Sequence, residues 1–349
     1  MKLSDTLRTE AERASATMRY RLGGNAFRFL CETHLELPPH PPRGSRTLAL
    51  FAHFDPQGVV DPYVAYYLRA LRDQGATIVF VSGSPTLTPE SVGSIRSLCT
   101  GIFTRRTLSY DFGSWHLAWC ILTQRGWSLD QFDRFLVAND SVFGPLFPLE
   151  DMYGSFHGAD MYGAVENTQM ISHLQSFFLA WDLNPRTRAF LNDFWNGFQY
   201  VVHKGAVIWR YEVGISARAR KAGLALNPFV SAAAIDLAYG RSHIRPWASK
   251  RSGRNNGTLH CWDGLIRDFR FPFLKTNLAR YDMPWHASMA DLRDVIERHT
   301  DYPFQLIQSN VDRLGRKAPP LVSGYARPMA GWTPAGRTET PRRGMPGSK

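Results

Sequence analysis

A polar triplet, Asn139-Asp140-Ser141, comes directly after a short apolar run from Arg134 to Ala138. The apolar run predicts a buried strand, and the Gly144-Pro145 pair that follows the triplet predicts a turn. A carboxylate at the carboxyl end of a buried strand lies where open α/β sheets carry out their ligand chemistry. Asp140 is therefore a candidate for that chemistry. The alternative is that Asp140 only caps a turn, as aspartate often does.

Three other predicted strands also end in polar or acidic residues. These ends are His53-Phe54-Asp55, Ser82-Gly83-Ser84 and, at the N-terminus of a helix, Tyr110-Asp111-Phe112-Gly113-Ser114. If the first four strands have the order 3-2-1-4 of a nucleotide-binding half, these ends converge with Asp140 on one edge of the sheet. Each end also has a structural interpretation: His53 as a core histidine, the serines as a turn, and Asp111 as a helix cap. The agreement of four strand ends favours a ligand site.

A second acid, Glu212, lies in the stretch Trp209 to Ser216, at the start of a predicted helix that Gly223 ends. A glutamate in the first turn of a helix is often there only because the helix dipole favours it. The functional interpretation is a general base that accepts a proton from a substrate hydroxyl.

The elements that position these residues alternate regularly. Apolar runs predict strands at Thr47–His53, Thr77–Val81, Ile102–Arg105 and Arg134–Ala138. Helical spacing predicts helices that begin at Pro62 and Pro89, each after a capping residue, and at Ser114. This alternation implies an α/β fold: a mostly parallel sheet with right-handed crossovers and helices on both faces.

Beyond the triplet the alternation is less regular. Predicted elements there are helices at 149–156, 184–198, 211–222 and 287–298, and strands at 161–165, 176–181 and 224–230. Residues 46–315 are therefore expected to form one domain. Residues 1–45 predict an N-terminal helical extension, whose second helix runs from Asn25 to Thr33, and a Pro-rich linker. The basic, Pro/Gly-rich tail at 316–349 is expected to be disordered.

The composition limits the class of protein. The 349 residues, 44% of them hydrophobic, can bury a large core, and the four cysteines contain no C-x-x-C pair that would indicate a zinc ribbon. No window reaches about 18 consecutive apolar residues, and the N-terminus lacks a signal core, so we expect a cytoplasmic protein. The net charge of +11 suits an anionic ligand or peripheral contact with the anionic inner face of the plasma membrane, and no nucleic acid partner is expected.

Several classes of enzyme are excluded by missing motifs. No G-x-G-x-x-G follows the first strand, no G-x-x-x-x-G-K-[ST] occurs, and no G-x-S-x-G is present. These absences argue against a dinucleotide-binding enzyme, a P-loop enzyme and an α/β-hydrolase.

Seven short stretches carry a resemblance to a known family over residues 47–280. They are Phe51-Ala-His-Phe-Asp55, Val60-Asp-Pro-Tyr-Val64, Tyr110-Asp-Phe-Gly-Ser-Trp115, Asn139-Asp-Ser-Val-Phe-Gly-Pro-Leu146, His173-Leu-Gln-Ser-Phe-Phe178, Tyr211-Glu-Val-Gly-Ile-Ser216 and Pro272-Phe-Leu-Lys-Thr276. In these stretches the chain resembles the rhamnan synthesis protein F family of bacterial polysaccharide glycosyltransferases. The resemblance implies a GT-A-like domain that moves a sugar, typically L-rhamnose from dTDP-rhamnose, to a cell-surface polysaccharide or a lipid-linked oligosaccharide.

The same resemblance implies roles for the site residues. Asp140 would hold a divalent metal, Mg or Mn, on the donor diphosphate, and Glu212 would be the catalytic base. The nucleotide sugar would be bound by residues from the strand ends and from a later stretch: His53, Asp55, Ser82, Tyr110, Asp111, Gly113, Asn139, Ser141, His173 and Gln175. The triplet departs from the family's usual Asp-x-Asp pattern in having a single carboxylate, although Mg²⁺ often needs only one or two protein carboxylates.

Two alternatives stay open. The chain could be a non-catalytic subunit that binds a glycan or a nucleotide sugar in a polysaccharide assembly complex, because the triplet has one acid. It could also be a phosphohydrolase with Asp55 as nucleophile, although no second aspartate follows two residues later. In the main interpretation the partners are a nucleotide-sugar donor and a glycan or polyprenyl-linked acceptor.

Overall fold

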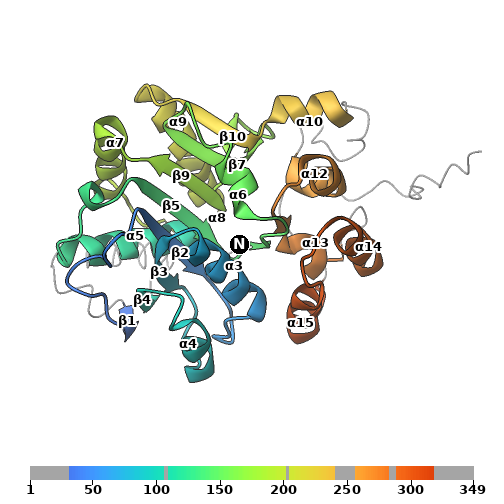
Figure 1. Ribbon diagram of the computed structural model, residues 1–349, viewed down its shortest axis with the longest axis horizontal. Coiled ribbons are helices and arrows are strands. Elements are labelled where there is room, and N and C mark those ends of the chain that lie inside the picture. The colour runs from blue at the N-terminus through green and yellow to red at the C-terminus, as the bar shows by residue number, and fades with distance from the viewer. Residues whose placement is uncertain (1–30, 106–108, 202–203, 240–255, 283–287, 318–349) are drawn as a thin grey trace, which may run out of the picture.

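The computed structural model describes residues 31–105, 109–201, 204–239, 256–282 and 288–317. Within these ranges a nine-stranded sheet forms the centre of the molecule (Figure 1). Its strands are β1 (Cys31–Leu35), β2 (Thr47–His53), β3 (Ala76–Ser82), β4 (Gly101–Arg105), β5 (Arg134–Asn139), β7 (Met161–Asn167), β8 (His173–Leu174), β9 (Phe178–Asp182) and β10 (Leu226–Val230).

The strand order is β1-β4-β3-β2-β5-β9-β7-β10, with β8 paired to β7. The predicted 3-2-1-4 order of the first four strands is therefore confirmed as β4-β3-β2-β5, and all three of these pairings are parallel. Strands β1, β8 and β9 run against the others. The carboxyl ends of β2 and β5 are neighbours, since Ala52 pairs with Asn139.

Helices cover both faces of the sheet because alternate residues of each strand point to opposite sides. Ala49 and Phe51 of β2 pack into the core that α3 (Pro62–Asp73) covers. Leu48 and Leu50 pack into the core beneath α5 (Tyr110–Gln124) and α7 (Pro185–Asn196). The predicted α/β fold class is confirmed.

The first core also receives helices from the end of the chain. These are α12 (Trp262–Phe269), α13 (Thr276–Arg280), α14 (Met289–His299) and α15 (Gln305–Leu314). Figure 1 shows them gathered in orange and red beside α3, away from α5 and α7. Sequence patterns predicted only α14 among them, so most of this covering layer is new.

Shorter helices complete the described ranges. They are α4 (Pro89–Ile95), a 3-10 turn (Leu129–Gln131), α6 (Leu149–Tyr153), α8 (Lys204–Val207), a π-turn (Ile208–Glu212), α9 (Val213–Lys221), α10 (Ala232–Tyr239) and α11 (Gly257–His260). No helix in these ranges is both long enough and apolar enough to cross a membrane.

Three predicted boundaries are wrong. Cys31 to Thr33 belong to β1, which pairs antiparallel with β4, rather than to a helix. The helix expected at Ser114 begins at Tyr110, so Asp111 lies in its first turn. Glu212 ends a π-turn that connects α8 to α9, so it does not open a helix. The expected helix over residues 1–30 and nearly all of the expected tail lie outside the described residues, and the division at 46 and 315 stays a prediction.

A two-stranded sheet joins the triplet to the end of the domain. Strand β6 (Val142–Phe143) pairs antiparallel with β11 (Leu274–Lys275). Gly144 follows with φ of 143°, and a Cβ at this position would collide with the carbonyl oxygen of Pro272. Gly144 therefore allows the two segments to approach closely.

We expect Gly144→Ala to lower the free energy of unfolding by at least about 2 kcal/mol, because it adds a steric collision to an unfavourable backbone conformation. Urea unfolding measures this loss. Gly75→Ala is the matched control, because Gly75 also has a positive φ, of 76°, but has open space around its Cα. That control should lose only about 1 kcal/mol, and equal losses in the two variants would contradict the argument.

Candidate active site

Asp140 lies at the carboxyl edge of the sheet and is buried. Its Oδ2 accepts a hydrogen bond from the Phe54 amide at 3.1 Å and lies 3.9 Å from His53 Nε2. Its backbone oxygen accepts a bond from the Tyr63 hydroxyl at 2.9 Å. Burial raises the pKa of Asp140 to about 6, although the Arg280 guanidinium and the Phe54 amide act to lower it. Asp140 is thus a carboxylate held at the predicted strand junction.

Two serine hydroxyls position His53 next to Asp140. Its Nδ1 lies 3.0 Å from Ser82 Oγ, which in turn donates to Ser84 Oγ at 2.8 Å. Burial lowers the pKa of His53 to about 4, so the imidazole is neutral at pH 7 and its contact with Asp140 is not an ion pair. Ser82 is fully buried. It therefore supports His53 instead of facing a ligand directly.

Asp111 connects the third strand end to the triplet. Its Oδ2 accepts a hydrogen bond from Asn139 Nδ2 at 2.8 Å, and Asn139 Oδ1 accepts bonds from the amide and hydroxyl of Ser141. Burial, and next the charge of Asp140, raise the pKa of Asp111 to about 7. A carboxyl group with a pKa near 7 can take up and release protons at physiological pH. The structure therefore brings Asp111, Asn139 and Ser141 together, as predicted.

A strained turn sets the position of Asp111. Ser109 and Tyr110 both have positive φ, of 77° and 49°, which non-glycine residues adopt only when the surroundings stabilise it. The Ser109 hydroxyl provides this support by bonding both the amide and the carbonyl of Val201. The Tyr110 side chain is half exposed, and Gly113 is buried within the first turn of α5. Only Tyr110 of these two can contact a ligand with its side chain.

Glu212 lies on the same edge, in the π-turn. π-turns inside helices occur frequently at functional sites. The negative charge of Glu212 acts to raise the pKa of Asp111 and the pKa of Lys275. The structure thus brings Glu212 into electrostatic reach of the strand ends, although 72 positions separate it from Asp140 in the sequence.

Two basic residues at this edge were given no role by the sequence patterns. Lys275, on β11, places its ammonium 4.1 Å from the centre of the Phe177 ring. Arg280, on α13, donates to the Tyr63 hydroxyl at 3.0 Å and to Asn310 Oδ1 at 2.8 Å. Burial lowers the pKa of Lys275 to about 8, while Glu212 and Asp111 act to raise it. A lone lysine directly after the apolar run Phe271 to Leu274 was the available sequence signal.

Asp55 is held by Arg313 of α15. Arg313 Nη2 lies 2.5 Å from Asp55 Oδ2, and Asp55 Oδ1 accepts bonds from the amides of Gln57 and Val59. Burial acts to raise the pKa of Asp55, but these bonds outweigh it and the pKa is lowered. Both carboxylate oxygens are engaged, which disfavours both a phosphohydrolase nucleophile and direct contact with a nucleotide.

His173 and Gln175 are occupied elsewhere. The ring of His173 contacts the Ile171 carbonyl at 2.6 Å, and Gln175 bonds Asn256 and Thr258. Both side chains are buried. In the part of the chain that the structure describes, neither has a hydrogen bond or ion pair with Asp111, Asp140 or Glu212. Their predicted contact with a sugar stays a prediction.

The described residues can hold a divalent metal only together with other ligands. No group of three or more His, Cys, Asp or Glu side chains in the described ranges is arranged to bind one. However, the charge of Asp140 reaches Asp111 and acts to raise its pKa, and Mg²⁺ is commonly bound by one or two carboxylates together with substrate phosphates and water. The residues therefore fit a metal ion whose coordination shell a donor diphosphate and water complete.

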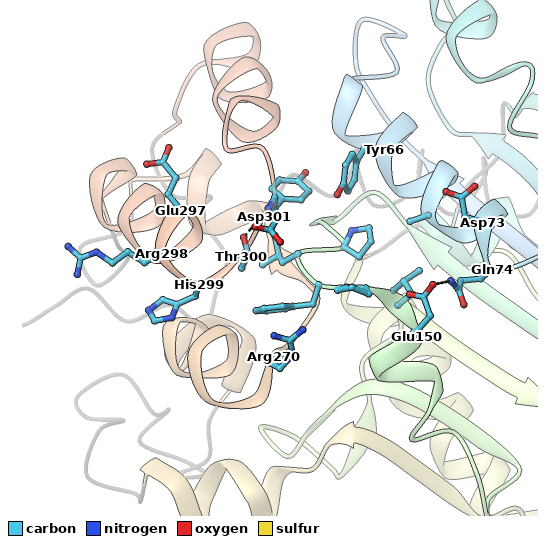
Figure 2. Close-up of a pocket in the computed structure, with 17 residues that line it drawn as sticks. Tyr66, Asp73, Gln74, Glu150, Arg270, Glu297, Arg298, His299, Thr300 and Asp301 are labelled. Carbon is cyan, nitrogen blue, oxygen red and sulfur yellow. Dashed lines mark hydrogen bonds between the residues drawn. The ribbon is translucent and has the colours of Figure 1, made fainter.

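A separate cleft of about 580 Å³ lies beside the second half of α3 (Figure 2). Tyr66, Asp73 and Gln74 line one side, and the end of α14 with Thr300 and Asp301 lines another. None of its lining residues is a predicted site residue. The cleft is therefore distinct from the acidic edge around Asp140.

The strand order and the acidic carboxyl edge together define an α/β protein with a candidate ligand site at the carboxyl edge of its sheet. The family model of rhamnan synthesis protein F matches residues 78–326, and the chain therefore belongs to that family. Among solved structures the chain is similar to a putative nucleotide-diphospho-sugar transferase from Desulfovibrio desulfuricans G20, with 13% identity over 54% of this chain and 80% of that one. The TM-score of 0.31 is too low to carry an argument about function. No curated protein matches the chain.

Proposed function

We propose that this chain is a GT-A-like glycosyltransferase that moves L-rhamnose from dTDP-rhamnose to a cell-surface polysaccharide or a polyprenyl-linked oligosaccharide. The observation that carries the proposal is the convergence of Asp111, Asp140, Glu212 and Lys275 on the carboxyl edge of the sheet. Open α/β sheets bind their ligands at this edge. Membership of the rhamnan synthesis protein F family supports the choice of sugar.

The proposed reaction is a single displacement. Glu212 takes the proton of the acceptor hydroxyl as its oxygen bonds to the anomeric carbon. The bond from that carbon to the diphosphate breaks, and its electron pair goes to the diphosphate oxygen. In this proposal the diphosphate binds at Asp140, whose carboxylate accepts a hydrogen bond from the Phe54 amide and lies 3.9 Å from His53 Nε2. A divalent metal held there by Asp140 would supply Lewis-acid stabilisation of the leaving group.

Calorimetry with dTDP-rhamnose, UDP-glucose and GDP-mannose, each with and without Mn²⁺, tests this function, together with a transfer assay. We expect tight binding of one donor and measurable transfer. Asp140→Asn should leave the fold intact and lower turnover about 10²- to 10³-fold, because electrostatic stabilisation of the leaving group is lost. If no nucleotide sugar binds, the glycan-binding subunit of an assembly complex becomes the better interpretation. Unchanged turnover of Asp140→Asn with added Mn²⁺ would remove its metal role.

A peripheral contact with an anionic membrane belongs to the same proposal. The net charge of +11 supports it, but much of the basic tail lies outside the described residues. Flotation of the full chain with phosphatidylglycerol vesicles, compared with neutral vesicles, measures that contact.

A further inference from the structure

The fold holds Lys275 beside the polar triplet. Its backbone pairs with Val142, the residue after Ser141. The next residue, Thr276, donates both its amide, at 3.0 Å, and its hydroxyl, at 3.1 Å, to the Ser141 carbonyl oxygen. Any movement of the triplet therefore carries Lys275 with it. The position of Lys275 beside Ser141 is therefore fixed by the pairing of β11 with β6 and by these two hydrogen bonds.

The ammonium of Lys275 makes no hydrogen bond and no ion pair with any residue that the structure describes. It lies over the Phe177 ring, 4.1 Å from the ring centre. The side chain is largely withdrawn from water. Asp111 and Glu212 act on it through space, and Lys204 opposes them. Holding a partly buried ammonium without hydrogen bonds to the protein is costly unless water or a ligand supplies them.

Two other partly buried cations, Arg280 and Arg313, differ in this respect. Arg280 bonds Tyr63 and Asn310, and Arg313 bonds Asp55 and Asp61. Their guanidinium groups are therefore already bonded within the protein. Of these three basic residues, Lys275 is the one whose N–H donors stay available to a ligand. A lysine ammonium is a compact charge with three donors and is a frequent phosphate ligand.

We propose that Lys275 binds the diphosphate of the nucleotide-sugar donor and stabilises the negative charge that develops on it as the glycosyl bond breaks. The inference rests on the proposed function and adds a residue and a charge to it. Preorganised charges that face a leaving group act most strongly in a site from which water is excluded. The Phe177 ring excludes water from one side of the ammonium and favours its positive charge.

The test compares the binding of dTDP, dTMP and thymidine to the full chain and to three variants, by calorimetry. We expect Lys275→Met to weaken dTDP binding about 10- to 100-fold, which is the usual effect of losing a charge-assisted hydrogen bond. Thymidine binding should stay unchanged, and dTMP should lie between. Lys275→Arg should keep most of the dTDP affinity. Lys221→Met, which removes an exposed lysine at the end of α9, is the matched control and should bind dTDP like the unaltered chain.

The outcomes separate this inference from the function on which it rests. If the unaltered chain binds neither dTDP nor any other nucleoside diphosphate, including UDP and GDP, the proposed function fails and the inference fails with it. If the unaltered chain binds a nucleoside diphosphate and Lys275→Met binds it equally well, only the role of Lys275 is overturned. A loss of thymidine binding equal to the loss of dTDP binding would also overturn it, since that pattern indicates a disturbed fold instead of a lost charge.

Discussion

Glu212→Gln is expected to lower turnover about 10²- to 10⁴-fold while leaving donor binding nearly unchanged, because general acid–base catalysis contributes that much to rate. Glutamine keeps the size of the side chain and removes its ability to take a proton. Glu212 lies in the π-turn at the acidic edge and is not fully buried, so an acceptor hydroxyl can reach it. Single-turnover transfer from a bound donor measures the effect without interference from product release.

Asp111 is the competing candidate for the same proton. Asp111→Asn removes a carboxylate from the same edge and keeps the side chain's size, so it is the matched comparison. If Glu212 is the base, Asp111→Asn should retain clearly more turnover than Glu212→Gln. The reverse order of effects would transfer the role to Asp111. A near-normal rate for Glu212→Gln would by itself exclude Glu212.

The pH dependence of turnover distinguishes the two candidates independently. Burial and the charge of Asp140 raise the pKa of Asp111 to about 7. A general base works only in its deprotonated form. If Asp111 is the base, turnover therefore rises with pH through about 7, and this rise persists in Glu212→Gln and disappears in Asp111→Asn.

The central strands and the position of the site could be predicted because local patterns determine them. Strand β2 is apolar on both faces, so its burial follows from the residues alone. The same holds for β3. The 3-2-1-4 order then places Asp140 beside His53, and the structure confirms that contact at 3.9 Å. Here a short-range pattern and one topological rule were sufficient.

The remaining features depend on contacts that the sequence does not reveal. Strand β1, CETHL, lacks an apolar run and exists because it pairs with β4, some 70 residues away. The early start of α5 needs the Ser109 contacts with Val201, which lies 92 positions later. Asp61 precedes Pro62 as a cap should, yet its side chain makes no capping bond and instead accepts bonds from Arg313 and Asn310. Local propensity correctly located Asp61 but could not identify its partners.

Arg313→Met is expected to lower the free energy of unfolding by about 3–5 kcal/mol, because it leaves two buried carboxylates without their cation. Arg313 Nη2 lies 2.5 Å from Asp55 and 2.6 Å from Asp61, and both acids are almost fully buried. Urea unfolding at pH 7 measures the loss. Arg298→Met is the matched control. Arg298 pairs with Asp294 on the exposed face of α14, and an exposed pair of this kind contributes at most about 1 kcal/mol.

The same variant shows how α15 supports the site. Through Asn310 the Arg313 cluster continues to Arg280, then to the Tyr63 hydroxyl, and so to the backbone oxygen of Asp140. The pKa of Asp55 is lowered in the folded state, so the stability that its pairing contributes is present at neutral pH and is lost as the pH falls through the folded pKa. The difference between Arg313→Met and the unaltered chain should therefore shrink in acid. A constant difference down to pH 3 would show that Arg313 acts through packing, and not through its charge on Asp55 and Asp61.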